Sequence, residues 1–203
     1  MLRLFLLISL CLVNTGYAEA KGKKARGAAA VLVPGAGGVS PADFLVRNQG
    51  AFAARGIATT FATSAGEIGS AIEQFRSQGL RVSLVSMSAG TKTAAEALAG
   101  GARPDRVVFA AGFLSVSDSG SVPAILGSPG VLPRTLVVHN RNDRCQFTPP
   151  GAVPGFVSWA RGRARAAWVT SSAAESPPCR PRSPHAFYRA DGAAIGPILG
   201  FVR

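Results

Sequence analysis

Residues 80–101 read LRVSLVSMSAGTKTAAEALAGG, and this stretch decides the fold. It begins with a near-continuous apolar run of strand length and ends with an alanine-rich segment of helical composition. Between them stands SMSAG, in which the small residues Ser86 and Gly90 lie two positions before and two positions after Ser88. The pattern predicts a strand, a sharp turn that presents Ser88, and a helix.

Strand-like and helix-like segments alternate along the chain on both sides of this unit. The expected strands cover residues 28–34, 56–63, 80–87, 105–114, 134–140 and 165–171. The expected helices cover residues 41–56, 66–79, 88–101, 155–163 and 187–203, and the last is expected to be interrupted or delayed by Gly196 and Pro197. Such alternation predicts an α/β fold, with a mostly parallel sheet, helices on both faces and functional loops at the carboxyl ends of the strands.

The length and composition indicate one domain behind a leader. A chain of 203 residues with 47% apolar residues is sufficient for a single core. Residues 1–20 combine Arg3, a short apolar run and small residues, so we expect a signal peptide there, followed by a basic leader over residues 21–27. The domain is expected over residues 28–203, and no stable membrane insertion is expected because no apolar run is long enough.

Removal of the signal peptide would leave two of the three cysteines, Cys145 and Cys179. In an oxidising compartment an even pair predicts one disulfide, with two free thiols as the alternative.

The net charge of +12 raises the question of an anionic partner. Its Arg and Lys residues are scattered, with local clusters only at residues 21–26 and 161–165, and few aromatic residues lie among them to stack on bases. We therefore expect no nucleic-acid binding. A module that binds an anionic surface or polysaccharide stays open as an alternative.

A serine hydroxyl needs a base to become a nucleophile, and the chain offers only two histidines. His185 lies in a loop after the last expected strand, which suits the base, whereas His139 lies at the end of an earlier strand and is expected to be a satisfied structural histidine. The alternatives are that Ser88 only caps its helix and that His185 is a surface loop residue.

The third residue should be an acid that follows the penultimate strand and orients the imidazole. Asp143 stands there, two residues before Cys145, so a disulfide to Cys179 would tie the acid loop to the loop of His185. Asp118, after the preceding strand, is the second candidate.

Acyl transfer also needs N–H donors for a developing oxyanion. The N–H of Ala89 follows the nucleophile, and the glycine-rich loop after the first strand offers Ala36 or Gly37 as a second donor. That loop does not match a dinucleotide fingerprint, since Ser40 stands where the last glycine would be needed. We expect no cofactor, and no metal site because no cluster has ligand spacing.

Together VLVPGAGG, VSMSAG, HNRNDRC and CRPRSPHAFY, in this order, resemble the α/β-hydrolase superfamily. Within it the chain is similar to small lid-less members such as dienelactone hydrolase and exported bacterial esterase-like proteins. The resemblance implies hydrolysis through an acyl-enzyme, with Ser88 as nucleophile, His185 as base and Asp143 as the orienting acid. The departures are Ser86 in place of glycine and Pro34-Gly35 in place of His-Gly before the oxyanion loop.

The sequence thus predicts an exported serine hydrolase, periplasmic or secreted, whose partner is a small soluble ester. Residues 113–133 are too few for a large lid, so we expect an open site. The alternative is a catalytically weak or inactive binding protein on the same scaffold. The oligomeric state is not predicted.

Overall fold

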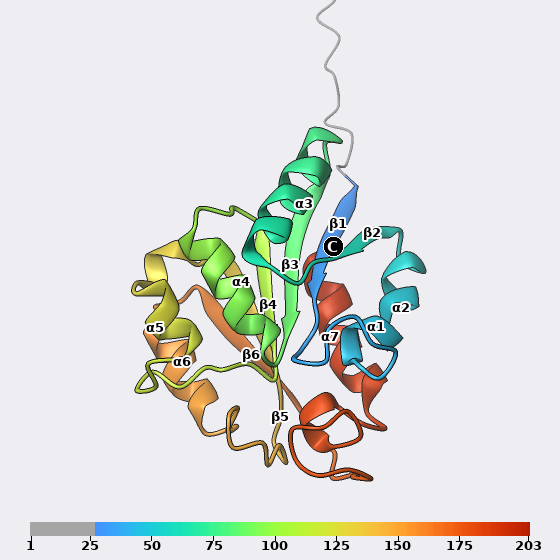
Figure 1. The fold of residues 1–203 in the computed structure, drawn as a ribbon, viewed down its shortest axis with the longest axis vertical. Helices are drawn as coiled ribbons and strands as arrows, with labels where there is room; N and C mark the ends of the chain where they lie inside the picture. Colours follow the sequence, from blue (N-terminus) through green and yellow to red (C-terminus); the bar gives the residue numbers. More distant parts are fainter. Residues whose placement is uncertain (1–26) are drawn as a thin grey trace, which may run out of the picture.

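A computed structural model of the chain describes residues 27–203 (Figure 1). The signal peptide and the basic leader expected before residue 28 lie outside the described residues, apart from Gly27.

The centre of the fold is a parallel sheet of six strands in the order β2-β1-β3-β4-β5-β6. The strand bounds are β1 Ala28–Val33, β2 Ile57–Phe61, β3 Arg81–Met87, β4 Arg106–Ala110, β5 Arg134–Asn140 and β6 Ala164–Val169. Four of the six strands, β1, β3, β4 and β5, carry runs of buried residues, as expected of a sheet covered on both faces. The alternating fold predicted from the sequence is confirmed.

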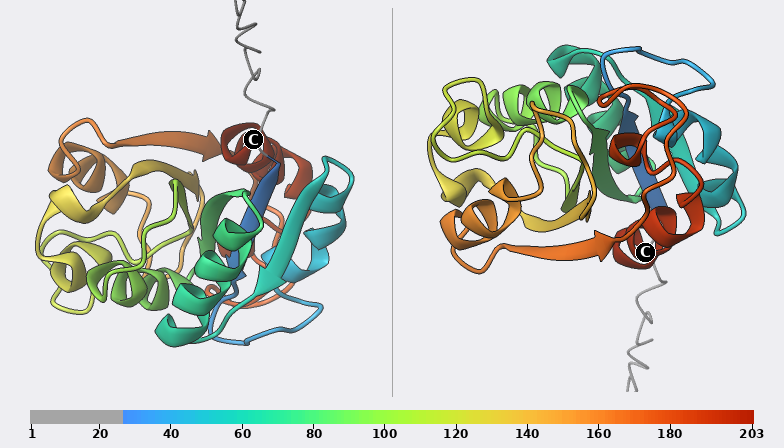
Figure 2. Two further views of the ribbon diagram at one scale, coloured as in Figure 1. Left: turned by 90° about the horizontal axis from the view of Figure 1, so that it is seen from above. Right: turned by 90° about the horizontal axis from the view of Figure 1, so that it is seen from below.

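Helices cover both faces of this sheet, as the two views of Figure 2 show. One face is packed by α1 Phe44–Arg47, α2 Gln49–Ala53 and α7 Asp191–Val202, which bury Phe44, Phe52 and Ile198. The other is packed by α3 Ala65–Ser77, α4 Gly90–Ala99, α5 Val122–Leu126 and α6 Ala152–Trp159. Two short 3-10 helices, η1 Pro129–Val131 and η2 Pro184–Ala186, complete the described elements.

The helix predicted over residues 41–56 is wrong in one respect, because the structure has two short helices that meet at Asn48. Asp43 caps the first of them, accepting a hydrogen bond from the N–H of Leu45. The side-chain amide of Asn48 donates to the carbonyl oxygen of Phe44 and to Oδ1 of Asp191. These side-chain bonds hold the break between the two helices.

The interruption predicted at Gly196 and Pro197 is also wrong, since α7 runs through both residues. Ile195 and Ile198 on either side of the proline are buried in the core. Proline inside a helix costs about 3 kcal/mol, and burial of a large aliphatic side chain contributes about 1.5–3 kcal/mol. Packing against the sheet therefore offsets the lost hydrogen bond.

The order of the strands also places the functional loops. β2 lies on one side of β1, and β3 and the later strands lie on the other. The direction in which strands are added to the sheet therefore reverses between β1 and β3. In open α/β sheets, ligands bind at such a switch point, outside the carboxyl ends of the strands. The loop 34–38 after β1 and Ser88 after β3 both lie there.

Candidate active site

Ser88 stands on a sharp turn between β3 and α4. Its φ of 51° lies in the left-handed region, and its N–H donates to the carbonyl oxygen of Ala110 on β4 at 2.9 Å. The turn also needs a glycine at residue 90, because a Cβ there would lie 2.3 Å from the carbonyl oxygen of Pro34. A strained strand-to-helix turn of this kind exposes a serine hydroxyl at the edge of the sheet.

Ser86, which replaces the glycine of the usual motif, fits this turn without an unsatisfied group. Its side chain is fully buried, and its hydroxyl donates to the carbonyl oxygen of Val108 at 3.1 Å. The neighbouring strand β4 therefore accommodates the larger residue.

Ser88, His185 and Asp143 come from three separate loops and meet in one hydrogen-bonded row. Nε2 of His185 lies 2.9 Å from Oγ of Ser88, and Nδ1 of the same ring lies 2.9 Å from Oδ2 of Asp143. His185 belongs to η2 after β6, and Asp143 belongs to the turn after β5. Both side chains are almost fully buried, while Ser88 is half-buried at the mouth of the site.

The carboxylate of Asp143 accepts hydrogen bonds from other groups besides His185. Oδ1 accepts the N–H of Cys145 at 2.8 Å, and Oδ2 accepts the hydroxyl of Thr148 at 3.1 Å. Burial raises the pKa of Asp143, but hydrogen bonds from His139, His185 and the Cys145 N–H outweigh it and hold the pKa well below its ordinary value. The acid is therefore ionised at neutral pH, as a partner for an imidazolium must be.

His139 lies against the same carboxylate. Its Nε2 is 3.3 Å from Oδ2 of Asp143 and 3.0 Å from the carbonyl oxygen of Thr148. Its Nδ1 is buried and has no hydrogen-bond partner among the described residues. The prediction of a satisfied structural histidine is thus wrong for Nδ1, which has no partner among the described residues, whereas Nε2 has acceptors within reach.

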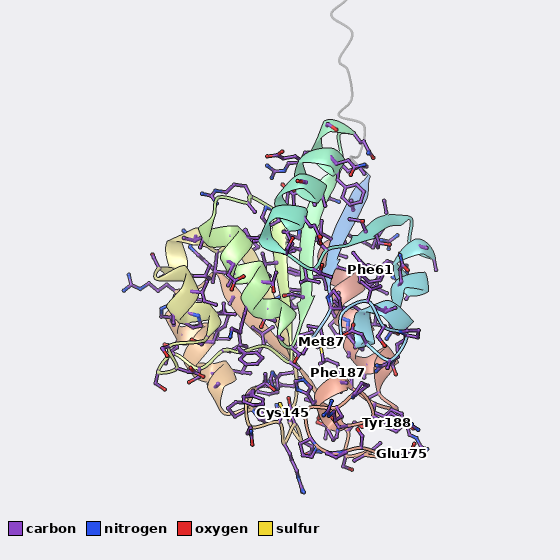
Figure 3. All side chains as sticks on the ribbon, in the orientation of Figure 1. Phe61, Met87, Cys145, Glu175, Phe187 and Tyr188 are labelled. Atoms are coloured by element: carbon purple, nitrogen blue, oxygen red, sulfur yellow. A yellow bond between two sulfur atoms is a disulfide. The ribbon has the colours of Figure 1, made fainter. Side chains whose placement is uncertain are left out.

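Two further features hold the acid and histidine loops together. Cys145 and Cys179 form a disulfide, which joins the turn of Asp143 to the loop before His185. Asn140, at the end of β5, donates from its buried amide to the carbonyl oxygens of Ser171 and Pro184. Figure 3 shows Cys145 and Phe187 below Met87, gathered at the carboxyl end of β3.

The candidate oxyanion donors face the same space as Ser88. Ala36, Ser88 and Ala89 line one cavity, and Gly37 joins Ala36 and Ser88 in lining a neighbouring one. Within residues 27–203, the N–H groups of Ala36 and Ala89 make no hydrogen bond. Asp43 holds the loop in place, because its Oδ2 accepts the N–H of Gly35 at 2.9 Å.

The neighbouring cavity measures about 240 Å³ and opens beside Ser88 and His185.

Asp118, the second candidate for the acid, is exposed and accepts the N–H of Gly120 in its own turn. Across residues 27–203, no group of three or more His, Cys, Asp and Glu side chains could hold a metal ion. No helix of that range is long and apolar enough to cross a membrane.

Several of these residues were missed by sequence reasoning. Thr148, Asn140 and Asp43 were not identified as parts of the site, and His139 was given another role. For His139 a signal did exist, because it stands four residues before Asp143 on the strand that leads to the acid turn. Thr148 and Asp43 carry no comparable signal, since their contacts depend on how the loops fold.

Comparison with known proteins found matches among solved structures only. No protein-family model and no curated protein matches the sequence. Among solved structures, the chain is similar to a serine hydrolase without a lid from Xanthomonas campestris, with a TM-score of 0.59 and 17% identity. That match covers 89% of this chain and 85% of the other.

Two more solved structures give the same result. The esterase domain of a Rhodothermus marinus protein aligns with a TM-score of 0.61 and 12% identity, covering 88% of each chain. The monoglyceride lipase of Saccharomyces cerevisiae aligns with a TM-score of 0.64 and 7% identity, covering 87% of this chain and 86% of the lipase. With its six parallel strands, single domain and short segment between β4 and β5, the chain has the fold of the α/β-hydrolase superfamily in its lid-less form.

Proposed function

We propose that the protein is an exported serine hydrolase that acts on small soluble carboxylic esters. The observation that supports this most strongly is the row of hydrogen bonds from Ser88 Oγ to His185 Nε2, and from His185 Nδ1 to Asp143 Oδ2. These are the contacts by which a base activates a serine and an acid orients the base.

In the proposed first half-reaction, Ser88 Oγ attacks the ester carbonyl carbon as its proton passes to Nε2 of His185. The N–H groups of Ala89 and of Ala36 or Gly37 donate hydrogen bonds to the carbonyl oxygen and stabilise the negative charge that develops on it. His185 then returns the proton to the leaving alkoxide, and the acyl group stays on Ser88.

In the second half-reaction, His185 takes a proton from a water molecule as the water oxygen attacks the acyl carbon. The bond between this carbon and Ser88 Oγ then breaks, His185 returns the proton to Ser88 Oγ, and the acid product leaves. The carboxylate of Asp143 stabilises the imidazolium in both halves. Its depressed pKa suits that role, because the acid then stays ionised while the histidine is charged.

Two features of the site support a small substrate. A cavity of about 240 Å³ beside Ser88 suits a short acyl chain, and the segment between β4 and β5 holds only α5 and η1. We place the protein outside the cytoplasm because residues 1–20 resemble a signal peptide and because the domain carries a disulfide.

Labelling with a fluorophosphonate probe tests this proposal. The oxidised protein lacking residues 1–20 should be labelled, and both Ser88→Ala and His185→Ala should lose the label while keeping the wild-type circular dichroism spectrum. A folded wild type that takes no label would refute the enzyme and favour a binding protein on this scaffold. Hydrolysis of 4-nitrophenyl acetate in preference to long-chain esters would support the small substrate.

A further inference from the structure

A second cavity, larger than the one of about 240 Å³, also borders Ser88. It measures about 630 Å³ and shares Ala36, Ser88, Cys179 and Arg180 with the smaller cavity. Since both cavities meet at the nucleophile, a substrate bound at Ser88 would extend into the larger one.

Two arginines line this larger cavity, and both are exposed. Arg144 and Arg180 make no ion pair and no side-chain hydrogen bond with the residues at 27–203. The nearby Arg182 and Arg189 differ, because both pair with Glu175. None of the residues that line the larger cavity is acidic, so its two positive charges are not neutralised by its own walls.

The disulfide keeps these two arginines together. Arg144 directly precedes Cys145 and Arg180 directly follows Cys179, and the Cα atoms of the bridged cysteines are 4.7 Å apart. A covalent link thus keeps the backbone positions of the two arginines close together beside the cavity that contains Ser88. Like charges repel each other, and an anion bound by both arginines would reduce that repulsion.

Two aromatic side chains also line this cavity. Phe113 and Phe147 stack with their ring centroids 6.1 Å apart and an angle of 16° between the planes. Phe147 is one of the few large apolar side chains on the described surface that is more than half exposed, at 55%. The exposed ring of Phe147, stacked on the partly buried ring of Phe113, offers a flat apolar group a surface on which to lie.

We propose that the cleft beside Ser88 recognises esters that carry an anionic group attached to a flat apolar group. Arg144 and Arg180 bind the carboxylate or phosphate, and Phe113 and Phe147 receive the flat group. Guanidinium groups bind both anions through paired N–H donors, so the shared chemistry is a pair of anionic oxygens on one group. This substrate class rests on the proposed hydrolase function of Ser88.

Four aryl acetates test the specificity, namely phenyl acetate, 4-carboxyphenyl acetate, 4-acetoxyphenyl phosphate and 4-(trimethylammonio)phenyl acetate. After correction for spontaneous hydrolysis, kcat/KM should be about tenfold or more higher for an anionic ester than for phenyl acetate, and lowest for the cationic one. The comparison between carboxylate and phosphate tells which anion the site prefers. The advantage should shrink as salt is raised, because the arginines are exposed.

Variants separate the site from the overall positive charge. Arg144→Gln and Arg180→Gln should each lower the ratio of anionic to neutral kcat/KM about threefold or more. Arg55→Gln is the matched control, because Arg55 is exposed and precedes β2 at the amino ends of the strands. Equal ratios in wild type and both cleft variants, or an equal loss in the Arg55 variant, would overturn the inference.

A binding measurement keeps this test independent of turnover. Ser88→Ala should bind 4-hydroxybenzoate, the product of the carboxylate ester, at least tenfold more tightly than phenol, and the added Arg144→Gln or Arg180→Gln should remove the difference. Equal binding of the two phenols would overturn the anion site even in an active enzyme. Absent turnover of every ester would instead refute the proposed function alone.

Discussion

The hydroxyl of Thr148 lies 3.1 Å from Oδ2 of Asp143, the same oxygen that accepts the ring of His185. The hydroxyl is also 3.0 Å from Nδ1 of His185, so it lies beside the contact between acid and base. Thr148 therefore helps to hold the carboxylate against the imidazole. It is a positioning residue, because it is placed to act on the substrate only through Asp143 and His185.

Thr148→Val keeps the shape of the side chain and removes the hydroxyl. A hydrogen bond to a charged group contributes about 1.5–3 kcal/mol, so we expect kcat for a short aryl ester to fall roughly tenfold or more, with little change in KM. Steady-state kinetics would measure the split, and Thr148→Ser should restore most of the lost rate. A rise in KM at constant kcat would contradict a positioning role.

The two histidines should respond differently to substitution. His185→Ala should abolish fluorophosphonate labelling, because no base would then lie within reach of Ser88 Oγ. His139→Ala should retain labelling at a reduced rate and lower the free energy of unfolding by about 2 kcal/mol, since it leaves a cavity beside a buried carboxylate. Labelling rates and urea unfolding would measure the two effects. Complete loss of labelling in a folded His139→Ala variant would contradict the assignment of His185 as the base.

The stability of the turn at Ser88 should depend on the glycine at residue 90. In Gly90→Ala the new Cβ would meet the carbonyl oxygens of Pro34 and Val33 at 2.3 and 2.6 Å, so backbone must move. We expect a loss of about 2–4 kcal/mol in the free energy of unfolding together with most of the activity. Gly69→Ala is the control, because nothing lies within 4 Å of its Cβ inside α3, and it should stabilise slightly. Equal stability of the two variants would contradict the account of the turn.

The sequence was sufficient to predict the sheet and the three loops that meet at its edge, because both follow from periodicity and strand order. β3 and α4 fall within one residue or two of the segments expected around Ser88. Where the strand ends, the parallel topology brings Ser88, Asp143 and His185 to one edge whatever the details of the loops.

What sequence could not supply depends on contacts between distant segments. The break at Asn48 is held by Asp191, 143 residues away, and no local pattern contains that bond. The bond between Gly35 and Asp43 spans only eight residues, but it depends on the shape of the loop between them, which no periodic pattern predicts. Helical continuity through Pro197 reflects core packing, which overrides the local preference of proline.

The disulfide between Cys145 and Cys179 should contribute to both stability and activity. It closes a loop with a sequence separation of 34 residues, for which the chain-entropy model gives about 3–4 kcal/mol. The double variant Cys145→Ser, Cys179→Ser should lose about that much stability, and kcat should fall because Asp143 and His185 lie in the loops that it joins. Thermal unfolding and ester kinetics would measure both. Unchanged kcat with lowered stability would restrict the bridge to a structural role.

Acid should remove a stability contribution that belongs to Asp143. Its pKa is depressed in the folded protein relative to an ordinary aspartate near 3.9, so the carboxylate stabilises the fold fully above that pH. As the pH falls below about 4, the unfolded chain takes up the proton first, and the contribution shrinks until the folded carboxyl also protonates.

Asp143→Asn cannot titrate, so the comparison with wild type isolates this group from the other carboxylates. The wild type should be more stable at pH 7 by on the order of 2 kcal/mol, and the difference should shrink progressively between about pH 4 and pH 2. Urea unfolding of both proteins across this range would measure it. A difference that stays constant with pH would mean that the hydrogen bonds from His139, His185 and Cys145 do not favour the ionised acid, and the row of contacts at Ser88 would then lack the charge that stabilises an imidazolium.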